Sequence, residues 1–483
     1  MPKFFCPIAI IKPNKALLLL VITLYQYPNL PTVQSNFLMF YLRFLSFCAL
    51  LIGLGACNRS SSPSSSAAAN DAPNMTQQST QQAVQQTTQQ VVIPSINSNS
   101  LGSGSTRGYT ADNTTSVLAN FKPLSPTIVS DTTNCVQVAI LLDTSNSMDG
   151  LIDQAKSQLW KIVNEIALAR DAKGNVPQLL LAIYDYGNDR YNAAEGYIQQ
   201  IAPLTSDLDA ISERLFALTT NGGSEYCGHV IQTATNALSW TKSPDRVKLI
   251  FIAGNEAFTQ GTVDYQQSCR NAIAKGIVVN TIFCGNYQEG INTKWKDGAD
   301  LADGKYLNIE QDRKVVHIDA PQDTELNRLN QQLNDTYMGY GAEGEASKMR
   351  QSVQDSNAGA YGAANASMRA VSKASAAYKN DSWDVVDAVK EKKIDLKKME
   401  QDELPPEMRS LKPEEREAYV ARKAAERETI QARIKQLSEE RRHFVDKKER
   451  EMRDADPNAN TLDVIMLRTI REQLTARGLH FEK

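Results

Sequence analysis

Residues 135–147, CVQVAILLDTSNS, decide the fold of this chain. The apolar run 136–142 is typical of a central parallel strand that is buried on both faces. It is followed by apolar residues three and four positions apart, which predict an amphipathic helix over 148–166. A polar loop therefore joins a buried strand to a helix, and Asp143, Ser145 and Ser147 lie in that loop.

The alternation of strand and helix continues beyond this stretch. Further strand-like runs lie at 179–184, 247–253 and 277–283, and helical patterns lie at 208–218, 230–240 and 265–274. Alternating strands and helices predict an α/β fold with a doubly wound, mostly parallel, Rossmann-like sheet. Sheets of this class bind ligands at the carboxyl ends of their strands. The loop after residue 142 is therefore the first place to look for a site.

Asp143, Ser145 and Ser147 form a D-x-S-x-S pattern. Its position between strand and helix resembles the metal-ion-dependent adhesion site of von Willebrand factor A (vWA) domains, over roughly residues 133–325. The resemblance implies that Ser145 and Ser147 bind a metal directly and Asp143 through water. Oxygen ligands of this kind suit Mg²⁺ or Mn²⁺. The resemblance also implies a vacant coordination position that accepts a carboxylate from a protein partner. The simpler alternative makes Ser147 a helix N-cap and Asp143 a turn residue.

Two further loops extend the resemblance. In 219–225, TTNGGSE, Ser224 is the best counterpart of the family's metal-binding threonine, with Thr220 as the alternative. The third loop departs from the pattern, because Gly254 stands where the family has an aspartate. Asn255 and Glu256 are candidate replacement ligands, and partner binding by a metal-free loop surface is the alternative.

The N-terminal part reads as a targeting segment. Residues 39–56 have the charged, apolar and small-residue order of a signal peptide. The LGAC sequence at 54–57 resembles the lipobox of bacterial lipoproteins, which implies a lipidated Cys57. Because Asn58 follows rather than an aspartate, we expect a lipid-anchored envelope protein at the outer membrane. We interpret residues 1–38 as a mis-annotated upstream extension, with a membrane segment near 16–25 as the alternative.

Two regions flank the predicted vWA domain, for which we expect the bounds 130–325. Residues 57–125 are rich in Ser, Gln and Thr, which predicts a disordered tether. Residues 326–483 are highly charged and helical in pattern, with Pro413 opening a long helix and Gly478 ending another. An exposed helix packed on its neighbour fits this pattern better than a dimerising coiled coil, because fewer than about two heptads are visible.

Composition narrows the functional classes. The formal net charge is −3 and no basic stripe is present, which argues against nucleic-acid binding. In an oxidising envelope, Cys227, Cys269 and Cys284 are candidates for a disulfide, with buried free thiols as the alternative.

No nucleophile elbow or P-loop is present, and Ser145 replaces the second acid of dehalogenase-like phosphatases. We therefore expect a non-enzymatic lipoprotein whose vWA domain binds a protein partner. A metal-free scaffold that acts through its C-terminal helices is the alternative, ahead of a phosphatase-like enzyme. The oligomeric state is left open.

Overall fold

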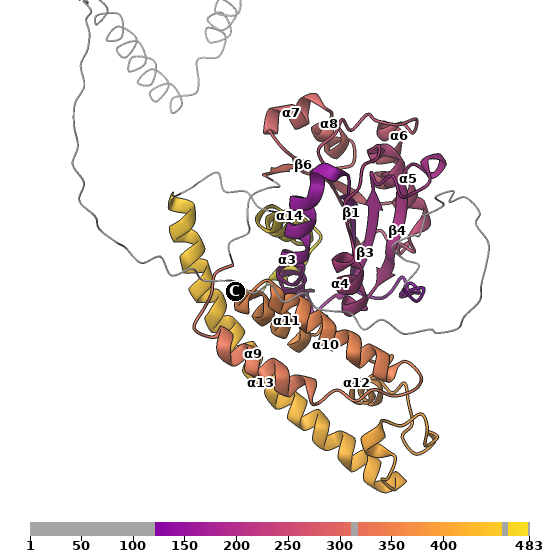
Figure 1. The fold of residues 1–483 in the computed structure, drawn as a ribbon, viewed down its shortest axis with the longest axis vertical. Helices are drawn as coiled ribbons and strands as arrows, with labels where there is room; N and C mark the ends of the chain where they lie inside the picture. Colours follow the sequence, from indigo (N-terminus) through magenta and orange to yellow (C-terminus); the bar gives the residue numbers. More distant parts are fainter. Residues whose placement is uncertain (1–120, 311–316, 456–461, 482–483) are drawn as a thin grey trace, which may run out of the picture. The chain divides into compact units, whose positions relative to one another are not determined.

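The computed structural model describes residues 121–310, 317–455 and 462–481 (Figure 1). Its centre is a six-stranded sheet in the order β4-β3-β1-β5-β6-β7. The strands are β1 (Cys135–Asp143), β3 (Gln178–Tyr186), β4 (Ile198–Thr205), β5 (Val247–Gly254), β6 (Val278–Cys284) and β7 (Tyr306–Ile309). Numbered along the chain, this is the 3-2-1-4-5-6 order of a doubly wound sheet, with the topological switch at β1. The predicted α/β fold class is confirmed.

Helices cover both faces of the sheet because the side chains of β1 alternate between them. Val136, Val138 and Leu142 pack with α3 (Asp149–Ala167) and α4 (Leu208–Phe216). Cys135, Ala139 and Leu141 face the opposite layer. That layer is formed by α5 (Cys227–Ala237), α6 (Tyr265–Ala274) and α8 (Trp295–Asp300), with α7 (Tyr287–Asn292) next to α8.

The edges of the sheet were not predicted. Strand β4 pairs antiparallel with β3, whereas the pairs formed by β1, β3, β5, β6 and β7 are parallel. A separate two-stranded sheet joins β2 (Ala169–Arg170) to β8 (His480–Phe481) near the C-terminus. His480 and Phe481 therefore contact the segment that follows α3.

The C-terminal region is helical, as predicted. It comprises α9 (Asp323–Asn334), α10 (Gly344–Ala360), α11 (Ala363–Ala374), α12 (Val385–Lys390), α13 (Pro413–Ala455) and α14 (Leu462–Ala476). Helices α11 and α14 pack on α3, α10 packs on α4, and α13 runs along α9 and α11 (Figure 1). The predicted boundary at residues 325/326 falls inside α9. Contact density places the sheet and these helices in one compact unit.

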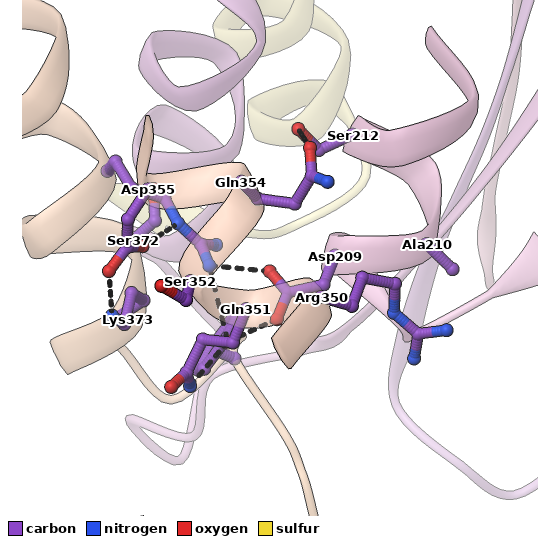
Figure 2. A network of polar contacts seen from close by, with 12 residues as sticks. Asp209, Ala210, Ser212, Arg350, Gln351, Ser352, Gln354, Asp355, Ser372 and Lys373 are labelled. Atoms are coloured by element: carbon purple, nitrogen blue, oxygen red, sulfur yellow. Dashed lines mark hydrogen bonds and ion pairs between the residues drawn. The ribbon is translucent and has the colours of Figure 1, made fainter. Parts of the chain in front are cut away.

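Buried charges join the helical region to the sheet domain. Arg369 of α11 is 0% exposed and forms ion pairs with Asp209 of α4 at 2.6 Å and with Asp355 of α10 at 2.9 Å. Figure 2 shows the surrounding polar contacts, in which Lys373 pairs with Asp355 at 2.8 Å. The Arg369 guanidinium also lies over the Trp160 ring of α3, 4.3 Å from its centroid. One side chain thus links α3, α4, α10 and α11.

A second buried arginine orders the helices among themselves. Arg427 of α13 pairs with Asp384 at 2.7 Å, donates to the carbonyl of Thr336 at 2.6 Å, and stacks over Tyr337. Some charged side chains of α13 are therefore buried, although most of its side chains face solvent.

Several predictions concern residues outside this description. They are the upstream extension 1–38, the signal peptide 39–56, lipidation of Cys57, and the tether up to residue 120. Within the described ranges, no helix has both the length and the apolar character needed to cross a bilayer.

Candidate functional site

The loop after β1 brings the D-x-S-x-S residues together at the switch point. Asp143 ends the strand and is completely buried, and its Oδ1 accepts the backbone N–H of Ser145 at 2.8 Å. The hydroxyls of Ser145 and Ser147 lie 3.3 Å apart. Asp143 Oδ2 is buried and has no hydrogen-bond partner among the described residues. The predicted residues therefore converge, and one carboxylate oxygen is left for another ligand.

Glu225 also faces Asp143, a position that the sequence analysis did not single out. It is 6% exposed, and its Oε2 lacks a hydrogen-bond partner in the described part of the chain. Both side chains lie over Gly187. A Cβ on that glycine would come within 2.7 Å of Glu225 Cγ and 2.8 Å of Asp143 Oδ1. The positive φ of 76° at Gly187 also favours glycine.

The electrostatics of this pair follow from burial. Burial raises the pKa of Asp143 to about 7. Burial also raises the pKa of Glu225 to about 8, and the adjacent charge of Asp143 adds to the effect. Two carboxylates in contact away from water cannot both ionise cheaply unless a positive charge joins them.

The candidate residues of the second loop lie in different places. The Thr220 hydroxyl donates to Asp149 in the first turn of α3, at the rim of the site. Ser224 is partly exposed and precedes Glu225. The loop is held against the first one, because the Asn221 backbone N–H donates to the carbonyl of Thr144 at 2.9 Å. No contact of the structure brings Thr220 to Asp143.

The packing around Gly254 in the third loop explains why a glycine stands where an aspartate was expected. A Cβ at Gly254 would lie 2.6 Å from the Tyr186 hydroxyl and 3.0 Å from Asp143 Oδ2. The Tyr186 hydroxyl is held in place by a 3.0 Å hydrogen bond to the carbonyl of Ala253. An aspartate at position 254 therefore does not fit unless its neighbours move.

The candidate replacement ligands of this loop differ from each other. Asn255 Nδ2 donates to the Ser147 hydroxyl at 3.0 Å, and its Oδ1 is buried without a hydrogen-bond partner among the described residues. Glu256 is exposed and accepts a hydrogen bond from Gln260 at 3.3 Å. Asn255 thus reaches the predicted site, whereas Glu256 lies at its solvent side.

Hydrogen bonds among buried polar side chains connect the loops of the candidate site to one another. The Thr144 hydroxyl donates to Asp185, and the Tyr191 hydroxyl donates to the other Asp185 oxygen at 2.7 Å. Asn188 bridges the Thr144 hydroxyl and the carbonyl of Thr219, both at 3.1 Å. These contacts hold three loops in one arrangement, although sequence patterning gave no sign of them.

The oxygen atoms at this edge fit a hard divalent cation. Carboxylate, hydroxyl and amide oxygens are the ligands that Mg²⁺ and Mn²⁺ prefer, and Asp143 presents a buried oxygen without a partner. In the described ranges, no three or more His, Cys, Asp or Glu side chains are grouped to hold a metal. An ion here would therefore need the hydroxyls of Ser145 and Ser147.

The cysteines do not form the candidate disulfide in this structure. Cys135, Cys227 and Cys269 are free and buried, and Cys284 is buried as well. Burial raises the pKa of the Cys269 thiol to about 12, and raises that of Cys227 well above its usual range. At neutral pH these thiols behave as core side chains.

Comparison with known proteins bears on the fold. The sequence matches no protein-family model and no curated protein. Among solved structures, the chain is similar to the conserved hypothetical protein BatB from Bacteroides thetaiotaomicron, with 17% identity and a TM-score of 0.28 over 36% of this chain and 90% of that one.

Two further solved structures are similar in the same way. The SpRpn10 VWA domain has 16% identity and a TM-score of 0.28, over 36% of this chain and 88% of that one. Proximal thread matrix protein 1 from the mussel byssus, with a zinc-occupied MIDAS motif, has 13% identity and a TM-score of 0.28, over 38% of this chain and 44% of that one. Such similarity supports no argument about ligands. The strand order and the D-x-S-x-S loop at the switch point are what make the sheet domain vWA-like.

Proposed function

We propose that the sheet domain binds a protein partner at the carboxyl edge of its strands through a divalent cation, Mg²⁺ or Mn²⁺. The observation that carries this proposal is the buried Asp143 Oδ2, which lacks a hydrogen-bond partner among the described residues and belongs to the same loop as the Ser145 and Ser147 hydroxyls. A buried carboxylate oxygen without a donor is costly, so a cation in this place would offset the cost.

The partner is proposed to contribute a carboxylate. The D-x-S-x-S loop supplies too few oxygens to complete six-fold coordination, so at least one position is left for water or an external ligand. A cation would also attract a carboxylate to an edge whose own charges are acidic. In this role Asp143, Ser145 and Ser147 hold the ion, and the backbone of β1 and α3 fixes their positions.

Metal binding is the first test of this proposal. Calorimetric titration of the purified protein with Mg²⁺ and Mn²⁺ is expected to give saturable binding, and Asp143→Asn is expected to abolish it. Glu195→Gln is the matched control, because it removes an exposed acid from the loop after β3 at the same edge. A flat titration of the unaltered protein, or equal binding by both variants, would contradict the proposal.

Membrane attachment is a separate part of the proposal. We propose that lipid on Cys57 anchors the protein to the cell envelope, at the outer membrane, and that residues 57–125 act as a tether. A single acyl chain gives only marginal binding, so stable attachment needs more than one. The Cys57→Ser protein is expected to move from the detergent phase to the aqueous phase in detergent partitioning. Unchanged partitioning would remove the anchor from the proposal.

A further inference from the structure

Glu225 is a second buried acidic residue beside Asp143. It lies at the end of the loop that precedes α5, and its side chain covers Gly187 beside Asp143. It is almost fully buried, yet Oε2 has no hydrogen-bond partner among the described residues. The backbone N–H of Glu225 donates to Gln260 Oε1 at 3.2 Å, which ties this residue to the third loop.

The third strand end cannot supply that carboxylate. Tyr186 and Asp143 fill the space over Gly254, and the nearest acid after it, Glu256, is exposed and engaged by Gln260. Two buried, partly unsatisfied carboxylates therefore come from the first and second loops only. Their contact is unfavourable when both are ionised unless a cation lies between them.

We infer that Glu225 supplies the second carboxylate of the metal site, in place of an aspartate at the end of β5. The inference rests on the proposed metal-binding function and changes its ligand set. Asp143 and Glu225 then provide the charge, and Ser145 and Ser147 provide hydroxyl oxygens. Asn255, which donates to the Ser147 hydroxyl, offers an amide oxygen that lacks a hydrogen-bond partner among the described residues.

This ligand set has a consequence for partner binding. Two carboxylates neutralise a divalent ion, so the site holds its metal without help from a partner. A site with one carboxylate leaves a net positive charge, which attracts an external carboxylate more strongly. The metal is therefore expected to bind before the partner, and a carboxylate ligand is expected to raise the metal affinity less than it would at a site with one carboxylate.

The test compares Mn²⁺ affinity and the Mn²⁺-dependent rise in melting temperature for three variants of the full-length protein. Glu225→Gln keeps the shape of the side chain and removes its charge. Glu256→Gln is the matched control on the exposed acid, and Ser224→Ala removes the alternative second-loop ligand. We expect Glu225→Gln to weaken Mn²⁺ binding about 100-fold or more, because affinity follows the number of charged ligands. Both other variants are expected to stay within about threefold.

The possible outcomes distinguish the proposed metal site from the proposed role of Glu225 as its ligand. If Glu225→Gln binds Mn²⁺ normally while Asp143→Asn does not, the metal site stands and Glu225 is not its ligand. If Ser224→Ala loses binding instead, the ligand is the one that the vWA resemblance implies. No binding by the unaltered protein overturns both proposals. The melting temperature without metal guards against misfolding. Glu225→Gln keeps the size of the side chain and replaces a buried acid with a neutral group, so that temperature is expected to be unchanged or higher.

Discussion

Replacing Arg369 with methionine is expected to lower the free energy of unfolding by about 3–5 kcal/mol, the usual cost of removing one partner from a buried ion pair. The change would leave Asp209 and Asp355 without their shared cation in a region where Arg369 is 0% exposed. It would also remove the stacking of the guanidinium on Trp160. Although burial acts in the opposite direction, Lys373 and Arg369 hold the pKa of Asp355 well below its usual range, which marks how strongly the carboxylate depends on them.

Urea unfolding measures this effect directly, with Arg328→Met as the matched control. Arg328 forms a 2.7 Å pair with Glu325 one helical turn away, but that pair is exposed to solvent. The control is therefore expected to unfold at the same urea concentration as the unaltered protein. Equal midpoints for Arg369→Met and Arg328→Met would mean that the network in Figure 2 does not hold α11 on the sheet domain.

The central strands could be predicted because burial on both faces leaves a direct trace in the sequence. Strands β1 and β5 read as continuous apolar runs, and α3 shows a clear helical period. Strand β4 was missed because this edge strand, IQQIAPLT, carries polar residues and a proline at its partly buried positions.

The docking of α10, α11 and α13 could not be predicted, because buried charged residues make many of their contacts. Arg369, Lys373 and Arg427 look like solvent-facing residues in a charged sequence, but each is buried against acids that lie far away along the chain. Hydrophobic periodicity identifies the apolar face of a helix, so it does not identify an interface that is formed by buried polar residues.

The candidate site could be predicted only where its geometry depends on residues close together in the sequence. The D-x-S-x-S pattern is local, and the short turn between β1 and α3 fixes its geometry. Which residue of the second loop faces Asp143 depends instead on Gly187 and on the path of the loop, and sequence spacing favoured Ser224 over its neighbour Glu225. The available signal was an acid two residues after the paired glycines, just ahead of a helix.

Deleting residues 462–483 is expected to abolish cooperative folding of the whole described unit. The deletion removes α14, in which Leu462, Met466, Ile470 and Leu474 are all buried. Leu462 and Met466 close the α3 side of the sheet, where they line a small apolar cavity with Leu142. Shortening a single buried aliphatic side chain costs about 2–5 kcal/mol. The loss of four, about 8–20 kcal/mol, is therefore as large as the roughly 5–15 kcal/mol by which such domains are stable.

Thermal unfolding monitored by circular dichroism tests this, with two point variants to calibrate it. Ile470→Ala is expected to lower the stability by about 2–5 kcal/mol, whereas Thr475→Ala, on the exposed side of the same helix, is expected to change it little. A truncated protein that melts cooperatively at the original temperature would show that α14 is an addition to the fold rather than part of it.

The role of α14 in the core limits the experiments that can distinguish partner binding at the metal site from partner binding by the C-terminal helices. If α14 completes the core, a C-terminal truncation that loses partner binding says nothing about where the partner binds, because the loops at the sheet edge are lost with the fold. Charge reversals on the exposed face of α13 leave the core intact, since its buried residues, such as Ile434 and Arg427, are untouched. Partner binding that survives those reversals but fails in Asp143→Asn belongs to the metal site, and the opposite pattern belongs to the helices.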